Sequence, residues 1–187
     1  MASRIEPLLT VADLDAYPDD DGNRYELIGG ELFVSCAPGI PHQRVILNLE
    51  IALCDYLKAN SIGILVPGAG AILSEYDAVI PDIAFVRNER WDHVVTGEKF
   101  TSAVDLVIEV LSPGAANRRR DLNAKRGLYG KYGVEEYWIV DIENLAVLIF
   151  RLEGPMLEEI AILTGDDDLS SPILPDFRLK VKTVFNL

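Results

Sequence analysis

The sequence predicts one α+β domain over residues 1–187, with a mixed β-sheet flanked by helices. Two segments carry apolar residues at three- and four-residue intervals, which indicates amphipathic helices. Several short apolar runs are bounded by Gly, Pro, Asn or Asp, which is typical of strands. The composition, 49% apolar and 25% charged residues, is that of a globular chain that buries a core.

The predicted elements fall into three parts along the chain. A short helix over 10–17, with Thr10 as its N-cap, and a hairpin of RYELI and ELFVS around Gly29-Gly30 occupy about residues 8–36. The central part, about 40–141, begins with an amphipathic helix from Pro41 to Lys58. It continues with strands at 63–74, 82–86 and 106–111, a helix over 119–132 and the strand YWIVD. Additional strands, beginning with LAVLIFR, fill about residues 145–187.

The net charge of −13 weighs against nucleic-acid binding, because phosphate recognition usually needs an excess of Lys and Arg. The basic residues are nevertheless concentrated in one segment, and the local field matters more than the sum. The segment contains Arg118, Arg119, Arg120, Lys125, Arg126 and Lys131.

Two carboxylates interrupt strands that are otherwise apolar. Glu109 lies within the run 106–111, where an unpaired ionised carboxylate would cost several kcal/mol. Asp82 follows a proline and opens the apolar run 82–86. If these strands are neighbours, the two carboxylates form an oxygen site suited to Mg²⁺ or Mn²⁺. The alternative to a metal or catalytic role is that Glu109 pairs with an arginine or lies on a solvated face of the strand.

Lys125 lies on the stripe of the predicted helix 119–132 that should face the sheet, together with Leu122, Tyr129 and Tyr132. Such a lysine either reaches past the helix edge to water or points at the carboxylates. In the second case, its ammonium group could orient water and stabilise negative charge on a phosphate.

Three further residues are accessory candidates. His42 begins an apolar helix stripe, so it is either a packed or capping histidine or a group beside the metal site. Glu26 and Glu31 lie in the predicted hairpin. Each is either a third acidic group of the site or an ordinary residue of an exposed strand.

Other classes of site lack their motifs. The chain has no GxGxxG after a strand, no GxxxxGK[ST], no GxSxG and no HExxH. The two cysteines, Cys36 and Cys54, lack CxxC spacing and are expected to be reduced core residues. The sequence shows no signal peptide and no apolar stretch that could span a membrane, so we expect a cytoplasmic protein.

Five segments, in this order and spacing, resemble the Uma2 family, a bacterial group often labelled as restriction endonucleases. They are RYELIGGEL, PHQRVILNLEIAL, VIPDIAFV, DLVIEVLSP and KRGLYGKYGVEEYWIVD, and the resemblance spans roughly residues 8 to 180. The family is placed in the PD-(D/E)xK nuclease superfamily, which implies a restriction-endonuclease-like core. It also makes a homodimer the expected assembly.

The resemblance implies Asp82 and Glu109 as the two acidic residues of the superfamily motif. The motif places a lysine two positions after the second acid, where this chain has Leu111. Lys125, from the following helix, is then the expected replacement.

The main hypothesis is an endonuclease that uses Mg²⁺ or Mn²⁺ to hydrolyse DNA. Asp82 and Glu109 would hold the ion, Lys125 would act on water or phosphate, and Arg118–Arg120 would contact flanking phosphates. One alternative is a catalytically silent binding or structural protein that keeps the nuclease fold. Another is a hydrolase of a small phosphate-containing substrate.

Overall fold

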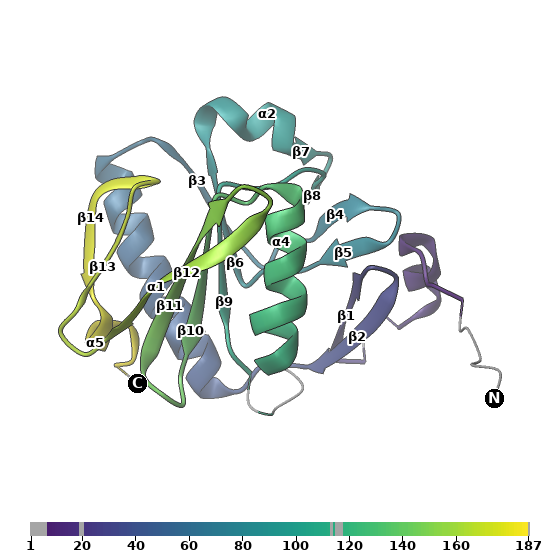
Figure 1. Cartoon of the computed structure of the whole chain (residues 1–187), viewed down its shortest axis with the longest axis horizontal. Coiled ribbons are helices and arrows are strands. Elements are labelled where there is room, and N and C mark those ends of the chain that lie inside the picture. Colours follow the sequence, from purple (N-terminus) through teal and green to yellow (C-terminus); the bar gives the residue numbers. More distant parts are fainter. Residues whose placement is uncertain (1–6, 19–20, 113, 115–117, 187) are drawn as a thin grey trace.

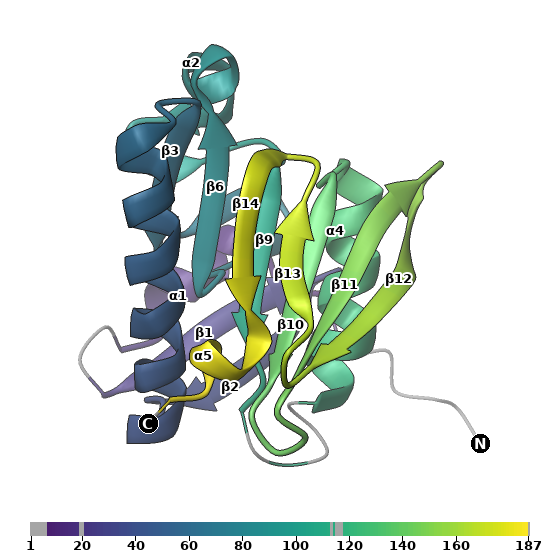
Figure 2. The same ribbon diagram turned by 90° about the vertical axis from the view of Figure 1, so that its left-hand side faces the viewer.

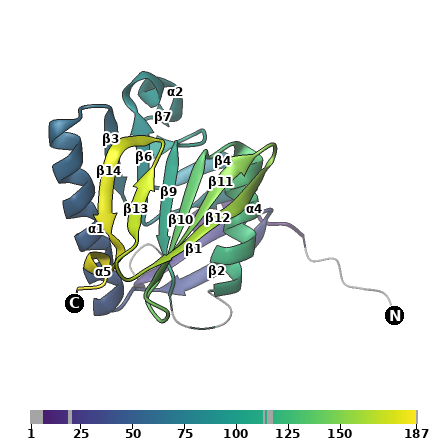
Figure 3. The same cartoon turned by 60° about the vertical axis from the view of Figure 1, so that its left-hand side comes forward.

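A six-stranded mixed sheet forms the centre of the molecule in this computed structural model, which describes residues 7–18, 21–112, 114 and 118–186. Its strand order is β12-β11-β10-β9-β6-β3, which can be followed across Figure 3. Strands β9 and β10 run parallel, and the other neighbours are antiparallel. The strands are β3 Gly63–Pro67, β6 Ile83–Arg87, β9 Leu106–Val110, β10 Glu136–Asp141, β11 Ala146–Glu153 and β12 Met156–Thr164.

A second sheet, with the order β2-β1-β5-β4-β8-β7, contains the N-terminal hairpin. Its strands are β1 Asn23–Ile28, β2 Glu31–Cys36, β4 Ala71–Ser74, β5 Asp77–Val79, β7 Val95–Thr96 and β8 Lys99–Phe100. In Figure 1 the hairpin and the β4–β5 pair lie beside α4, with the N-terminal segment beyond them. A third sheet pairs β13 Asp168–Ser171 with β14 Leu174–Lys180.

Helices lie on both faces of the central sheet. The long helix α1 (Ile40–Ala59) and the β13–β14 hairpin lie on one side, and α4 (Arg126–Tyr132) lies on the other (Figure 2). A π-helical segment, η3 (Arg120–Lys125), leads directly into α4. The remaining helices are short: η1 Val11–Ala16, η2 Asn88–Arg90, α2 Trp91–Val94 and α5 Val181–Val184.

The alternation of side chains along the central strands divides the core in two. Ile83 and Phe85, like Ile108, pack in the cluster that includes α1. Ala84 and Val107 point the other way, into the cluster that includes α4. By the same alternation, Asp82 and Glu109 belong to the face covered by α4 and the N-terminal hairpin.

The predicted α+β class is confirmed, but several details differ. The predicted strand 63–74 is wrong as one element, because the chain turns at Gly68 (φ +62°) and splits it between two sheets. Cys36 and Cys54 are free as expected, but both are exposed, so the expectation that they lie in the core is wrong. Within the described residues, no helix is long and apolar enough to cross a membrane.

Candidate active site

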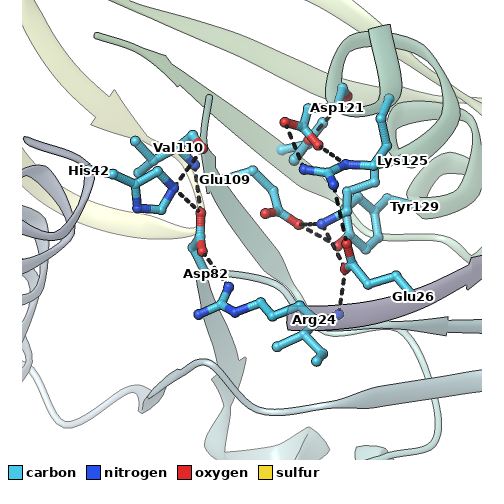
Figure 4. Close-up of polar contacts among 12 residues, drawn as sticks. Arg24, Glu26, His42, Asp82, Glu109, Val110, Asp121, Lys125 and Tyr129 are labelled. Atoms are coloured by element: carbon cyan, nitrogen blue, oxygen red, sulfur yellow. Dashed lines mark hydrogen bonds and ion pairs between the residues drawn. The ribbon is translucent and has the colours of Figure 1, made fainter. Parts of the chain in front are cut away.

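Asp82 and Glu109 are brought together by the pairing of β6 with β9. These strands are antiparallel and Ile83 lies opposite Ile108, so the residues flanking this pair, Asp82 and Glu109, are also opposite each other. Both side chains are buried, with exposed fractions of 5% and 4%. Figure 4 shows their carboxyl groups side by side.

Asp82 is held by contacts on both carboxylate oxygens. Its Oδ2 accepts a hydrogen bond from the amide of Val110 at 2.9 Å, and its Oδ1 accepts one from Arg24 Nη1 at 3.1 Å. His42 Nε2 lies 3.4 Å from Oδ2. Burial works to raise the pKa of Asp82, but the contacts with His42 and Val110 and the charge of Lys125 outweigh it and lower that pKa. Asp82 is therefore an ionised carboxylate at neutral pH.

Glu109 is in a different electrostatic state. Its Oε1 accepts hydrogen bonds from Lys125 Nζ and from the Tyr129 hydroxyl, both at 2.8 Å. Burial, opposed by the charge of Lys125 and reinforced by the negative charges of Asp82 and Glu26, raises the pKa of Glu109 to about 8. A cation placed near this carboxyl group would favour its ionised form.

Lys125 comes from η3, and the geometry of that segment explains its position. A π-helix makes i→i+5 hydrogen bonds, so Arg120 and Lys125, five residues apart, lie about one turn apart on the same side. Lys125 is 2% exposed, and its Nζ also lies 2.9 Å from Glu26 Oε1. Burial opposes its charge, but Glu109, Glu26 and other nearby carboxylates outweigh that effect and raise the pKa of Lys125. Lys125 therefore carries a positive charge.

Glu26 reaches the same cluster from the N-terminal hairpin. It is 2% exposed near the middle of β1, and its Oε1 also accepts a hydrogen bond from the amide of Ile80 at 2.8 Å. Its Oε2 lies 3.9 Å from Arg120 Nη1. The hairpin thus supplies a third acidic side chain on the opposite side of Lys125 from Glu109, as Figure 4 shows.

His42, in the first turn of α1, holds the end of β9. Its Nε2 lies 2.9 Å from the carbonyl oxygen of Val110, which can only accept, so Nε2 carries the proton. Its Nδ1 is buried and has no hydrogen-bond partner within the described part of the chain. His42 therefore contacts both Asp82 and the backbone that follows Glu109.

Other candidates are placed differently from the sequence-based expectation. Glu31 is exposed at the start of β2, beside the hairpin turn, and does not line the hollow between the carboxylates.

Arg118 pairs with Asp141 Oδ2 at 2.7 Å. Arg120 is 8% exposed and pairs with Asp121 at 2.8 Å. Arg120 lines the hollow and Arg119 is exposed, so the three arginines lie in different surroundings, and their contact with phosphates stays a prediction.

Two residues at the site were not predicted from the sequence to be functional. Arg24, in the hairpin, binds Asp82, and the hydroxyl of Tyr129 binds Glu109. Tyr129 lies on the stripe of the predicted helix that faces the sheet, and this position is the sequence signal that could have identified it. Nothing in the local pattern around Arg24 distinguishes it from an exposed strand residue.

The residues around the carboxylates enclose a small hollow with a cavity volume of about 20 Å³, room for about one water molecule or a bare ion. Asp82, Glu109 and Glu26 are among its lining residues, and carboxylates are the ligands that a hard divalent cation such as Mg²⁺ or Mn²⁺ prefers. Glu109 Oε2 accepts no hydrogen bond from any described residue, and Figure 4 shows it turned toward Asp82.

The protein ligands alone would leave the coordination of an ion incomplete. Among the described residues, no three His, Cys, Asp or Glu side chains are arranged to hold an ion by themselves. Mg²⁺ ordinarily keeps several waters and binds one or two carboxylates together with substrate phosphates. Such an ion would therefore leave coordination positions open to a substrate.

The fold and the site together define an α+β protein with a buried carboxylate–lysine cluster at one end of a mixed sheet. The chain belongs to the Uma2 family, described as "Putative restriction endonuclease", whose model matches residues 11–182. A search of curated proteins found no match.

A solved structure supports the fold. A crystal structure from Anabaena variabilis, described as "a putative nuclease belonging to DUF820", has a TM-score of 0.76 and 18% identity. The match covers 95% of this chain and 97% of that one, and at this identity it shows the fold alone. The type IIG restriction endonuclease BpuSI is matched with a TM-score of 0.39 and 16% identity. That match covers 78% of this chain and 15% of the other, and it carries no argument here.

Proposed function

We propose that this protein is an endonuclease that uses Mg²⁺ or Mn²⁺ to hydrolyse phosphodiester bonds in DNA. The observation that most supports the proposal is the convergence of Asp82, Glu109 and Lys125 on one hollow. The family description is consistent with this class of reaction. We also keep the homodimer and the cytoplasmic location as predictions.

Asp82 and Glu109 are the residues that would hold the ion, with Glu26 near them. A bound divalent ion polarises a phosphate and lowers the pKa of bound water. The ammonium of Lys125, 2.8 Å from Glu109 Oε1, would orient water or stabilise negative charge that develops on the phosphate. Tyr129, through its 2.8 Å bond, orients the Glu109 carboxyl group, and His42 fixes the backbone beside Asp82.

The size of the hollow limits what can enter it. A cavity of about 20 Å³ can take an ion or a phosphate oxygen, so the rest of a substrate lies outside it. A phosphodiester in an extended strand can present its oxygens at the mouth of the hollow while the rest of the strand lies outside.

A plasmid-nicking assay tests the proposal. Wild-type protein should nick supercoiled plasmid with Mg²⁺ or Mn²⁺ and not with EDTA. Asp82→Asn, Glu109→Gln and Lys125→Met should each lower the rate by about 100-fold or more. Glu31→Gln is the matched control, because it removes the charge of an exposed hairpin glutamate outside the hollow. Wild-type protein that cuts neither the plasmid nor single-stranded DNA with either ion, or variants that nick as fast as wild type, would refute the proposal.

A further inference from the structure

A groove on the N-terminal side of the molecule adjoins the candidate active site. It has a cavity volume of about 610 Å³, and its walls come from the η1 segment, β1 and β8. Its lining includes Leu14, Asp15, Tyr17, Tyr25 and Lys99. The volume falls in the range of about 300–1,000 Å³ that is usual for ligand sites.

The groove lies next to the hollow that holds the carboxylates, and two residues contribute to both. Arg24 and Ile80 line both cavities. The amide of Ile80 donates to Glu26 in the hollow, and the guanidinium of Arg24 donates to Asp82. A strand whose phosphate enters the hollow would therefore have its neighbouring nucleotide at the groove.

Two tyrosines form an aromatic wall in the groove. The rings of Tyr17 and Tyr25 have centroids 4.8 Å apart and an interplanar angle of 35°. The Tyr25 hydroxyl is hydrogen-bonded to Asp21, which fixes the direction of its ring. Both side chains are partly exposed. Partly exposed aromatic rings beside a phosphate-binding site are the usual means by which proteins stack unpaired bases.

A partly apolar cavity of about 150 Å³ adjoins the groove, and its lining includes Val11, Ala71, Ile72 and Val79. Lys99 and Asp15 line both this cavity and the groove. The exposed side chain of Lys99 makes no ion pair within the described part of the chain. Apolar side chains beside an exposed cation suit a nucleobase and its phosphate.

We propose that this groove binds an unpaired nucleotide next to the scissile phosphate, so that the preferred substrate is single-stranded or locally unpaired DNA. The inference rests on the proposed nuclease function and specifies its substrate. The base stacks against Tyr17 and Tyr25, while Arg24 and Lys99 contact the phosphates on either side. In a duplex the base faces are already stacked, so they are not available to the tyrosines.

Fluorescence anisotropy with a short labelled oligothymidine, compared with a duplex of equal length, tests the proposal. The measurement is made on the full chain in EDTA, so that binding is read without hydrolysis. Wild-type protein should bind the single strand at least about tenfold more tightly than the duplex. Tyr17→Ala should weaken single-strand binding by about tenfold, and Tyr17→Trp, which keeps an aromatic face, should restore it.

Lys99→Glu is a second variant that does not depend on the packing of Tyr17. It should weaken binding and make the dependence of log K on log salt shallower by about 0.7, the value for one lost phosphate contact on a single strand. Arg178→Glu is its control, because Arg178 is an exposed cation of β14 outside the groove. Tyr76→Ala, at an exposed tyrosine that is also outside the groove, is the control for Tyr17→Ala. Both controls should bind like wild type.

The outcomes separate this proposal from the proposed function. A wild type that binds the duplex as tightly as the single strand, or binds neither, overturns the groove assignment, as do controls that lose as much affinity as the groove variants. If single strands bind through Tyr17 and Lys99 but neither the plasmid nor a single strand is cut with either ion, the groove assignment stands and the endonuclease proposal falls. If nicking occurs without a single-strand preference, the groove assignment alone falls.

Discussion

Lys125 Nζ lies 2.8 Å from Glu109 Oε1, although the two residues are 16 positions apart and come from different elements. Glu109 is part of the buried strand β9, and Lys125 is the last residue of the π-helical segment η3. The lysine also contacts Glu26, so one ammonium group serves two buried carboxyl groups. This arrangement makes Lys125 important for stability as well as for the proposed chemistry.

Replacing Lys125 with methionine should destabilise the fold by about 3 kcal/mol, because it leaves two buried acidic groups without their cation. Urea unfolding at pH 7 measures the change. Arg119→Met, at an exposed arginine directly before η3, should change stability by less than about 0.5 kcal/mol. A Lys125→Met variant as stable as wild type would show that the three side chains do not form this buried cluster.

Arg24 should compete with a divalent ion for Asp82. Its guanidinium donates to Oδ1 at 3.1 Å, and its side chain is 33% exposed, so it can move away from the carboxylate. Arg24→Gln removes the competing cation, and Mn²⁺ affinity should rise roughly fivefold, which corresponds to an ion pair of about 1 kcal/mol. Isothermal titration with Mn²⁺ measures this, with Arg178→Gln as the control. Weaker Mn²⁺ binding in Arg24→Gln would mean that Arg24 supports the ion site.

The stability of the metal-free protein should depend on pH through Glu109. The pKa of Glu109 is about 8 in the fold, above its ordinary value of 4.5, so the fold favours the protonated form. The contribution of Glu109 to the free energy of unfolding is therefore fully present below pH 4.5 and is lost as the pH rises through 8. Glu109→Gln cannot ionise, so its melting temperature relative to wild type should rise between pH 5 and pH 9. Thermal melts in EDTA measure the difference, and a constant difference across this range would contradict the pKa.

Asp77 should anchor the N-terminal hairpin to α4. Its Oδ1 accepts a hydrogen bond from the amide of Gly29 at 2.6 Å, and its Oδ2 accepts bonds from the Tyr132 hydroxyl at 2.7 Å and Lys131 Nζ at 3.0 Å. Because hydrogen bonds to a charged group are each worth about 1.5–3 kcal/mol, Asp77→Ala should cost about 2–4 kcal/mol in urea unfolding. Glu75→Ala, at an exposed neighbour, should be nearly neutral. Equal losses in both variants would rule out a specific anchor.

Two sequence patterns made part of the site predictable. The continuous apolar run 106–111 distinguishes Glu109 as a carboxylate in a buried strand, and the stripe of the following helix points Lys125 inward. Asp82 is recognisable because it opens the neighbouring apolar strand. The assembly of these three residues then needs only the pairing of β6 with β9, which the structure provides.

Other features depend on tertiary geometry that has no local signal. The inward direction of Arg120 follows from the wider turn of η3, and a regular helix pattern does not anticipate a π-helical segment. The separation of β3 from β4 follows from the left-handed turn at Gly68, within a run that reads as one strand. Glu26 and Glu31 occupy equivalent-looking places in the hairpin sequence, and only the packing against η3 and α4 buries the first and leaves the second exposed.

The central claim is that Asp82 and Glu109 hold a divalent ion, and isothermal titration of Mn²⁺ tests it most directly. Wild-type protein and Glu31→Gln should show saturable binding with the same affinity, whereas Asp82→Asn and Glu109→Gln should each bind at least about tenfold more weakly. Binding that is absent in wild type, or that is equally strong in all four proteins, would contradict the claim.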